Sequence, residues 1–137
     1  MTQAKKEEIF FWHLEDIVKN NVQIPFPDSP NSINFISTSN APLYDGLLIK
    51  VGNIIIQKNV TVLEEKNFLI TSTTTIQFLD GISSLVSIQT FNSSSPFIAD
   101  EIRGTYSFVS GRFFNKNPSY VFSILPDTTR RVIVSYD

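Results

Sequence analysis

The chain has 137 residues, no cysteine, and 11 basic against 13 acidic residues, which gives a formal net charge of −2. This length suits one domain, spanning residues 1–137, with a hydrophobic core of its own. The absence of cysteine excludes disulfides, thiolate nucleophiles and cysteine-ligated zinc. The charge balance, with small basic pairs such as Lys5-Lys6 and Arg130-Arg131, argues against a nucleic-acid partner.

The sequence also lacks the usual signals for membrane insertion and export. No apolar run approaches the roughly 20 residues that a membrane-spanning helix needs. Residues 1–8 contain neither the apolar core nor the cleavage site of a signal peptide. We therefore expect a cytoplasmic protein without a membrane span.

The amino-terminal element, residues 5–21, fits two patterns. With a period of 3.6 residues, one face collects the apolar side chains of Phe10, Leu14, Ile17 and Val18, which favours a helix. With a period of two, Phe10, Trp12 and Leu14 share a face, which suits a strand. The residues alone leave both open, and we prefer the helix.

The rest of the chain has the pattern of an all-β protein. Three prolines within residues 24–30 predict an extended connector, so residues 1–30 form an amino-terminal element and connector, and residues 31–137 form the main sheet. From residue 32 onward, short runs rich in Ile, Val, Thr, Phe and Tyr alternate with turn-forming clusters about every ten residues.

Individual strands and turns follow from these runs. We expect one run to end at Asn40-Ala41-Pro42, and a separate short strand at residues 60–63. Between them, Gly52-Asn53 predicts either a hairpin turn or a bulge. Residues 68–79 form one long strand, and Asp80-Gly81 predicts a tight turn into a returning strand.

About eight antiparallel strands in so short a chain can form a closed barrel or a two-sheet sandwich. Closure removes exposed sheet edges, and an eight-stranded barrel encloses room for side chains or one small ligand. We predict an all-β fold, a single antiparallel β-barrel of about eight strands with a short amino-terminal helix or strand. The twelve phenylalanines either fill this barrel, which we prefer, or line a pocket or a subunit contact.

One segment resembles a known family. Phe10-Phe11-Trp12-His13-Leu14-Glu15-Asp16-Ile17 is similar to the aromatic-rich first strand of the dirigent proteins, a branch of the allene-oxide-cyclase-like barrels. The family's motif ends in His-Asp-Ile; here Asp16 and Ile17 match, and Glu15 replaces the histidine. Later hairpin segments and the closing strand also resemble the family, whereas its Gly-Gly-Thr-Gly turn is missing.

The resemblance implies that the amino-terminal segment is a strand and that the barrel confines a reactive aromatic or epoxide intermediate, commonly in a trimer. Confinement in one geometry removes competing reaction paths. Asp16 alone carries over, as a candidate catalytic acid or hydrogen-bond partner at the pocket.

The remaining candidate ligand-binding residues come from side-chain chemistry. His13, the only histidine, excludes a multi-histidine metal site and can act as a base beside Glu15 or Asp16, although a surface position is the simpler interpretation. Arg103 can form a charged cluster at a barrel rim. Tyr106 and Tyr120 can contact a ligand through their polar tips.

Two further stretches have a chemical and a structural interpretation. Arg130-Arg131 can grip an anion, because arginine matches carboxylate and phosphate geometry, or can discourage edge association. The run from Thr71 to Thr75 can offer hydroxyls to a ligand, or can form a solvent-facing strand surface.

The sequence contains no nucleophile elbow, phosphate loop or calcium loop, so we expect no metal and no cofactor. We predict a barrel that binds a small apolar or aromatic molecule and forms a homo-oligomer, and we favour binding over catalysis. The alternative is a structural or interaction module with a filled barrel. A cavity of some hundreds of Å³, lined by aromatic and a few polar groups, distinguishes the first from the second.

Overall fold

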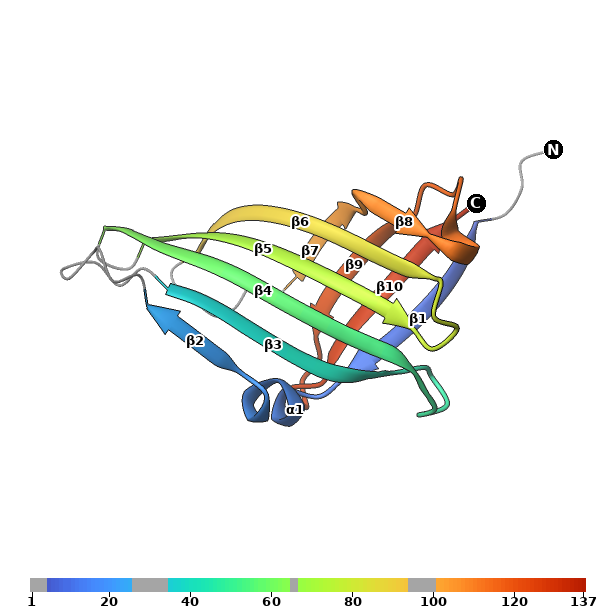
Figure 1. Ribbon diagram of the computed structural model, residues 1–137, viewed down its shortest axis with the longest axis horizontal. Coiled ribbons are helices and arrows are strands. Elements are labelled where there is room, and N and C mark those ends of the chain that lie inside the picture. The colour runs from blue at the N-terminus through green and yellow to red at the C-terminus, as the bar shows by residue number, and fades with distance from the viewer. Residues whose placement is uncertain (1–4, 26–34, 65–66, 94–100) are drawn as a thin grey trace.

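The computed structural model describes residues 5–25, 35–64, 67–93 and 101–137, which form ten strands, one α-helix and one 3-10 helix (Figure 1). The strands are β1 (Lys6–Trp12), β2 (Val22–Pro25), β3 (Phe35–Tyr44), β4 (Lys50–Glu64), β5 (Asn67–Phe78), β6 (Ser84–Ser93), β7 (Glu101–Thr105), β8 (Phe108–Ser110), β9 (Ser119–Ile124) and β10 (Arg130–Tyr136). The helices are α1 (Leu14–Lys19) and η1 (Gly111–Phe113). None of the helices in this part of the chain is long and apolar enough to cross a membrane.

All the strands belong to one antiparallel sheet that curls into a barrel. Its order is β7-β9-β10-β1-β3-β4-β5-β6-β8, and β2 pairs with β3 beside this path. The first and last strands, β1 and β10, pair over seven residues from Lys6↔Tyr136 to Trp12↔Arg130. The predicted all-β antiparallel barrel is confirmed.

The barrel closes through a single bent segment. β7 pairs with β9 and β8 pairs with β6, yet β7 and β8 are separated along the chain by two residues alone, Tyr106 and Ser107. The Ser107 amide donates to the Val86 carbonyl at 2.8 Å, and the Tyr106 amide donates to the Pro118 carbonyl at 3.2 Å. The two ends of the sheet order therefore meet within residues 101–110.

The amino-terminal element contains both of the alternatives that its sequence allows. Residues 6–12 form β1, which lies in the sheet between β10 and β3, so the preferred helix is wrong there. The helix α1 begins only at Leu14, after His13 adopts an extended backbone. Because a strand inside a sheet gains hydrogen bonds and packing on both sides, tertiary pairing overrides the helical pattern of residues 6–12.

Two strand boundaries also differ from expectation. β3 continues through Asn40-Ala41-Pro42 to Tyr44, and β4 runs unbroken from Lys50 to Glu64, so residues 60–63 are not a separate strand. The turn between β3 and β4 lies instead at Asp45, whose carboxylate accepts hydrogen bonds from the amides of Leu47 at 2.9 Å and Ile49 at 3.0 Å. An aspartate that binds backbone amides two and four residues ahead stabilises such a turn.

Of the two readings of Gly52-Asn53, the bulge is confirmed. The pairing of β3 with β4 shifts register between Leu43↔Gly52 and Tyr44↔Lys50, which leaves Val51 as the extra residue. A Cβ at Gly52 would collide with the Gln77 carbonyl on β5, so only glycine fits this close approach. The long strand β5 and the turn at Asp80-Gly81 are confirmed, with Gly81 at a φ of 77°.

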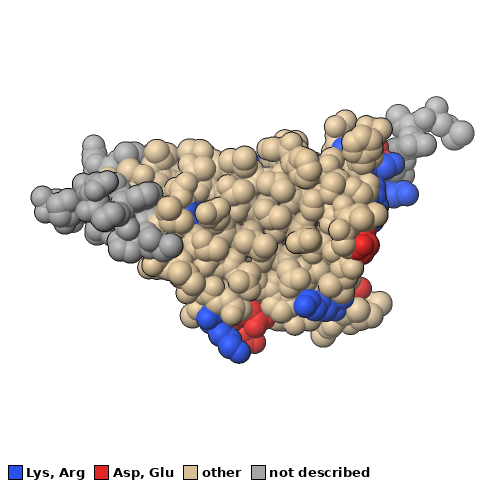
Figure 2. Space-filling model, viewed as in Figure 1, with Lys and Arg blue, Asp and Glu red and all other residues tan. Residues whose placement is uncertain are grey.

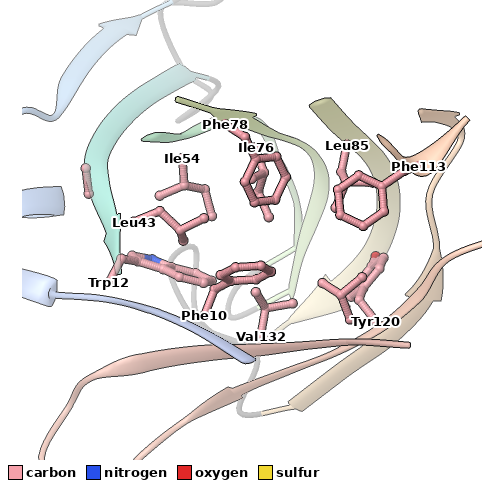
Figure 3. Packing of buried hydrophobic residues seen from close by; sticks show 12 residues of the cluster. Phe10, Trp12, Leu43, Ile54, Ile76, Phe78, Leu85, Phe113, Tyr120 and Val132 are labelled. Carbon is pink, nitrogen blue, oxygen red and sulfur yellow. The ribbon is translucent and has the colours of Figure 1, made fainter. Parts of the chain in front are cut away.

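Aromatic side chains fill one end of the barrel. Phe10, Phe78 and Phe113 are buried, with ring centroids 5.4 Å apart in the pairs Phe10–Phe78 and Phe78–Phe113. Figure 3 shows that Leu85 and Val132 pack with these rings in one buried cluster. Arg112 lies over the rings of Phe78 and Phe113, and its Nη1 donates to Glu8 Oε2 at 2.5 Å.

The outer face of β3 to β6 is nearly free of charge. Its outward positions carry threonine, asparagine and isoleucine side chains such as Thr73, Thr75, Ile55 and Ile88. Figure 2 shows this face as an almost uninterrupted uncharged surface, with charged side chains at its lower edge and its right-hand end.

Candidate functional site

The other half of the barrel is hollow. A cavity of about 510 Å³ lies above a floor of inward-facing apolar side chains. Where β3 to β6 form the barrel wall, this floor is a cross-strand row of four buried residues, Ala41, Ile54, Ile76 and Leu85. The cavity therefore begins where the apolar core ends.

Polar side chains line the wall formed by β3 to β6. Two successive cross-strand rows project inward there: Ser39, Ile56, Thr74 and Ser87, and then Ser37, Lys58, Ser72 and Gln89. Asn21, which follows α1, donates from its amide nitrogen to the hydroxyls of Ser37 and Ser39, each at 2.7 Å. Beyond these rows Val60 and Ile70 are again fully buried, so the polar band is enclosed between apolar layers.

Aromatic and aliphatic side chains line the opposite wall, formed by β1, β7, β9 and β10. Trp12 stacks on Phe122 with ring centroids 5.6 Å apart, and Tyr106 packs against Tyr120 at 4.9 Å. Trp12 is 3% exposed, and its Nε1 has no hydrogen-bond partner within the described ranges. The cavity thus has one wall of hydroxyl and amide groups and one wall of rings.

A short polar contact joins the two walls at the seam where the barrel closes. Gln89 Nε2 on β6 donates to the Tyr120 hydroxyl on β9 at 2.5 Å and to the Arg103 carbonyl on β7 at 3.0 Å. Gly104 leaves the space for this contact, because a Cβ at that position would lie 2.7 Å from the Tyr120 hydroxyl and collide with the Gln89 amide. Gln89 therefore fixes Tyr120 in the cavity wall.

Burial changes the ionisation of Tyr106. Desolvation, with a smaller contribution from Tyr120, raises the pKa of the Tyr106 phenol well above its usual value of 10.0. Tyr106 makes no side-chain hydrogen bond to another residue in the described part of the chain. It therefore presents a neutral hydroxyl, able to donate one hydrogen bond, to the cavity.

Two cationic side chains, Lys58 and Arg130, also face the cavity. Burial and the nearby charge of Arg130 lower the pKa of Lys58, and burial lowers the pKa of Arg130. No aspartate or glutamate occurs among the described residues that line the cavity. The described lining therefore contains two basic side chains and no carboxylate.

The structure places two of the five predicted site residues together. Tyr106 and Tyr120 both line the cavity. Arg103 lies outside it, with a 74% exposed side chain and an ion pair to Glu101 at 2.9 Å. His13 packs against Tyr44 at a ring distance of 5.5 Å and lines a second, more open pocket. Asp16 is half-buried on α1 and does not line the cavity. Its catalytic role therefore stays a prediction.

Other lining residues were missed. Ser37 and Ser39 on β3, and Ser87 on β6, are buried side chains of the polar wall. In the threonine run, Ser72 and Thr74 face inward, while Thr71, Thr73 and Thr75 lie on the outer face. The buried Ile70 and Ile76 show that the even-numbered positions of β5 face inward, because side chains of a strand alternate between its two faces.

Solved structures share this architecture over nearly the whole chain. A pyocyanin demethylase matches with a TM-score of 0.65 and 10% identity, covering 98% of this chain and 100% of that one. An exo-specific intermolecular Diels–Alderase matches with a TM-score of 0.60 and 14% identity, covering 98% of each chain. A pterocarpan synthase dirigent protein matches with a TM-score of 0.54 and 14% identity, covering 97% of this chain and 84% of that one.

The chain has the dirigent-like β-barrel fold. The fold resemblance seen in the first strand is thereby confirmed, and β1 is a strand, as the resemblance implied. No family model and no curated protein matches the sequence, and the identities of the solved structures show the fold alone.

Proposed function

We propose that this protein binds a small organic molecule with an aromatic or other planar apolar body inside the hollow half of its barrel. The observation that carries the proposal is the two-walled cavity of about 510 Å³. This volume lies in the range of small-molecule sites, which are mostly apolar with a few placed polar groups.

The aromatic wall provides the main binding surface. Trp12, Phe122, Tyr106 and Tyr120 present ring surfaces from neighbouring strands of the closed barrel. Rings pack favourably against other rings in offset or tilted geometry, beyond the value of the area that they bury. A planar apolar ligand is the molecule that best matches this wall.

The polar wall supports binding of a molecule that also has oxygen or nitrogen atoms. The hydroxyl of Ser87 makes no hydrogen bond to another described residue, although the side chain is only 4% exposed. The neutral phenol of Tyr106 is a second available donor. Groups of this kind orient a ligand through hydrogen bonds.

The alternative, a module with a solid barrel, requires a core that continues through its whole length. Here the two cross-strand rows that follow Ile54 and Ile76 contain serine, threonine, lysine and glutamine, with Ile56 as their one apolar side chain. Three of the similar structures bear names that describe reactions of small organic molecules, which fits a barrel used for binding such molecules. These considerations support binding in the cavity over a filled scaffold.

Two variants on one strand test the proposal. We expect Thr74→Phe, whose ring would enter the cavity, to weaken binding of the neutral fluorescent probe N-phenyl-1-naphthylamine by about tenfold or more, equal to about 1.4 kcal/mol. Thr73→Phe places the same ring on the outer face and should leave the affinity unchanged. Equal affinities of both variants and the unaltered protein would show that the probe binds elsewhere and would contradict the proposal.

We further propose that the protein forms a homo-oligomer through the uncharged outer face of β4 to β6. Ile88 is 57% exposed and Ile55 is 38% exposed on this face. A face without charge can approach its own copy without like-charge repulsion, and exposed apolar side chains favour that contact. Ile88→Lys should shift the mass measured by analytical ultracentrifugation towards the monomer, whereas a monomer already present in the unaltered protein would contradict the proposal.

A further inference from the structure

We propose that the molecule bound in the barrel carries an anionic group, such as a carboxylate, held at Arg130 with a second positive charge from Lys58. This inference rests on the proposed binding function and specifies the class of ligand. It follows from the positions of these two side chains in a cavity whose described lining has no carboxylate.

Arg130 lies at the edge of the aromatic wall. It is the first residue of β10, directly opposite Trp12 on β1 and Ile124 on β9. The strand alternates, so Arg130, Val132 and Val134 project inward. A molecule whose rings lie on the aromatic wall therefore reaches the guanidinium with its polar end.

Hydrogen-bonding capacity remains on Arg130. Its Nη1 donates to the Thr128 carbonyl, and Arg130 forms no ion pair with a described carboxylate. A guanidinium has five N–H donors in a planar fork, and this fork matches the two oxygens of a carboxylate. The arginine can therefore bind an anionic oxygen group from the cavity without losing its contact to Thr128.

Lys58 adds positive charge from the polar wall. It lies on β4 between Ser37 on β3 and Ser72 on β5, its direct cross-strand neighbours. Burial, and to a smaller extent the charge of Arg130, lowers the pKa of Lys58. An anionic group that binds Arg130 from the cavity would also be attracted by the charge of Lys58, and the serine hydroxyls beside Lys58 can donate further hydrogen bonds.

A pair of fluorescent probes isolates the charge of the ligand. 8-Anilinonaphthalene-1-sulfonate has the ring system of N-phenyl-1-naphthylamine plus one sulfonate. We expect Arg130→Gln and Lys58→Gln each to weaken sulfonate-probe binding by about tenfold, because hydrogen bonds between charged groups are stronger than neutral ones. The affinity for the neutral probe should change by no more than about twofold, since only the aromatic wall holds its rings.

A matched control removes one positive charge from a side chain that does not line the cavity. Arg103→Gln alters an exposed arginine on the outer side of β7 and should leave both affinities unchanged. If Arg130→Gln does not fold, the Lys58→Gln variant and the salt dependence provide the test. Added sodium chloride should weaken binding of the sulfonate probe alone.

The outcomes separate the two proposals. If both glutamine variants bind the sulfonate probe as the unaltered protein does, while Thr74→Phe still loses the neutral probe, the anionic ligand is refuted and the binding function stands. If Thr74→Phe affects neither probe, the binding function itself fails. Selective loss of the sulfonate probe in Arg130→Gln or Lys58→Gln supports both.

Discussion

Ser87 offers a direct test of the hollow barrel through protein stability. Its side chain faces the cavity, is 4% exposed, and forms no hydrogen bond to another described residue. In Ser87→Leu, three carbon atoms replace one hydroxyl oxygen. At about 0.8 kcal/mol for each buried carbon, less about 0.5–1 kcal/mol for ordering the longer side chain, full burial stabilises the fold by about 1.5 kcal/mol. Because the cavity is partly open, we expect about 1 kcal/mol.

The sign of the change in unfolding free energy distinguishes a hollow barrel from a packed one. In a packed core, an enlarged side chain costs about 1–3 kcal/mol, because neighbouring groups must move. Leu85 lies two residues earlier on the same strand and faces the filled part of the barrel, fully buried. We therefore expect Leu85→Phe to lower the free energy of unfolding, while Ser87→Leu raises it.

Urea denaturation, with the transition followed by tryptophan fluorescence, measures both changes. The unfolding free energies can be compared if the m-value, the slope of the free energy against urea concentration, is the same in the unaltered protein and in both variants. If Ser87→Leu is destabilised by 1 kcal/mol or more, as we expect for Leu85→Phe, then the half of the barrel described as hollow is packed. Such a result would contradict a hollow barrel.

Two further predictions concern the seam and the filled end. Gly104→Ala should lower the free energy of unfolding by about 2 kcal/mol, because the new Cβ displaces the Gln89 amide, whereas Gly46→Ala, with no atom within 4 Å of its Cβ, should have little effect in the same urea assay. Burial opposes ionisation of Glu8, but its hydrogen bond and ion pair with Arg112 outweigh this and lower its pKa below the ordinary 4.5. Glu8→Gln should therefore cost about 1 kcal/mol at neutral pH, and the cost should fade as the pH drops below 4.5, because a lowered carboxyl pKa stabilises the fold only while the group is ionised. A cost independent of pH between 7 and about 3 would contradict the ionic role of Glu8.

The sheet could be predicted from the sequence because local patterns determine it. The long β5 and the Asp80-Gly81 turn each follow from residues that adjoin one another. The boundary between β1 and α1 could not be predicted, because residues 6–12 become a strand through pairing with β10, more than a hundred residues away. Pairing at that separation leaves no trace in a short window of sequence.

The tyrosines of the site could be predicted, and its serines could not. Tyr106 and Tyr120 combine a ring with a hydroxyl, which marks them in any chain. Ser72 lies within a run of polar residues, where an inward position looks the same as an outward one. Whether an inward serine meets a core or a cavity depends on its depth along the closed barrel, which requires the register of all its neighbours.

The parity of β10 could not be read from the sequence, because Val132-Ile133-Val134 is an unbroken apolar run. In the structure Val132 and Val134 are buried and face inward, so the inward face of the strand includes Arg130 and excludes Arg131. The two arginines of the pair therefore face opposite sides of the sheet. Only their adjacency along the chain suggested that they act together.

The different chemistry of the two cavity walls has a stereochemical consequence. Rings from β1 and β9 face hydroxyls from β3, β5 and β6 across the same space. A flat guest that stacks on the rings of Trp12 and Phe122 has one face against them and its other face towards the serines. In the proposed binding mode the two faces of the guest therefore lie in chemically different surroundings, and a reagent that arrives from one wall would meet a single prochiral face.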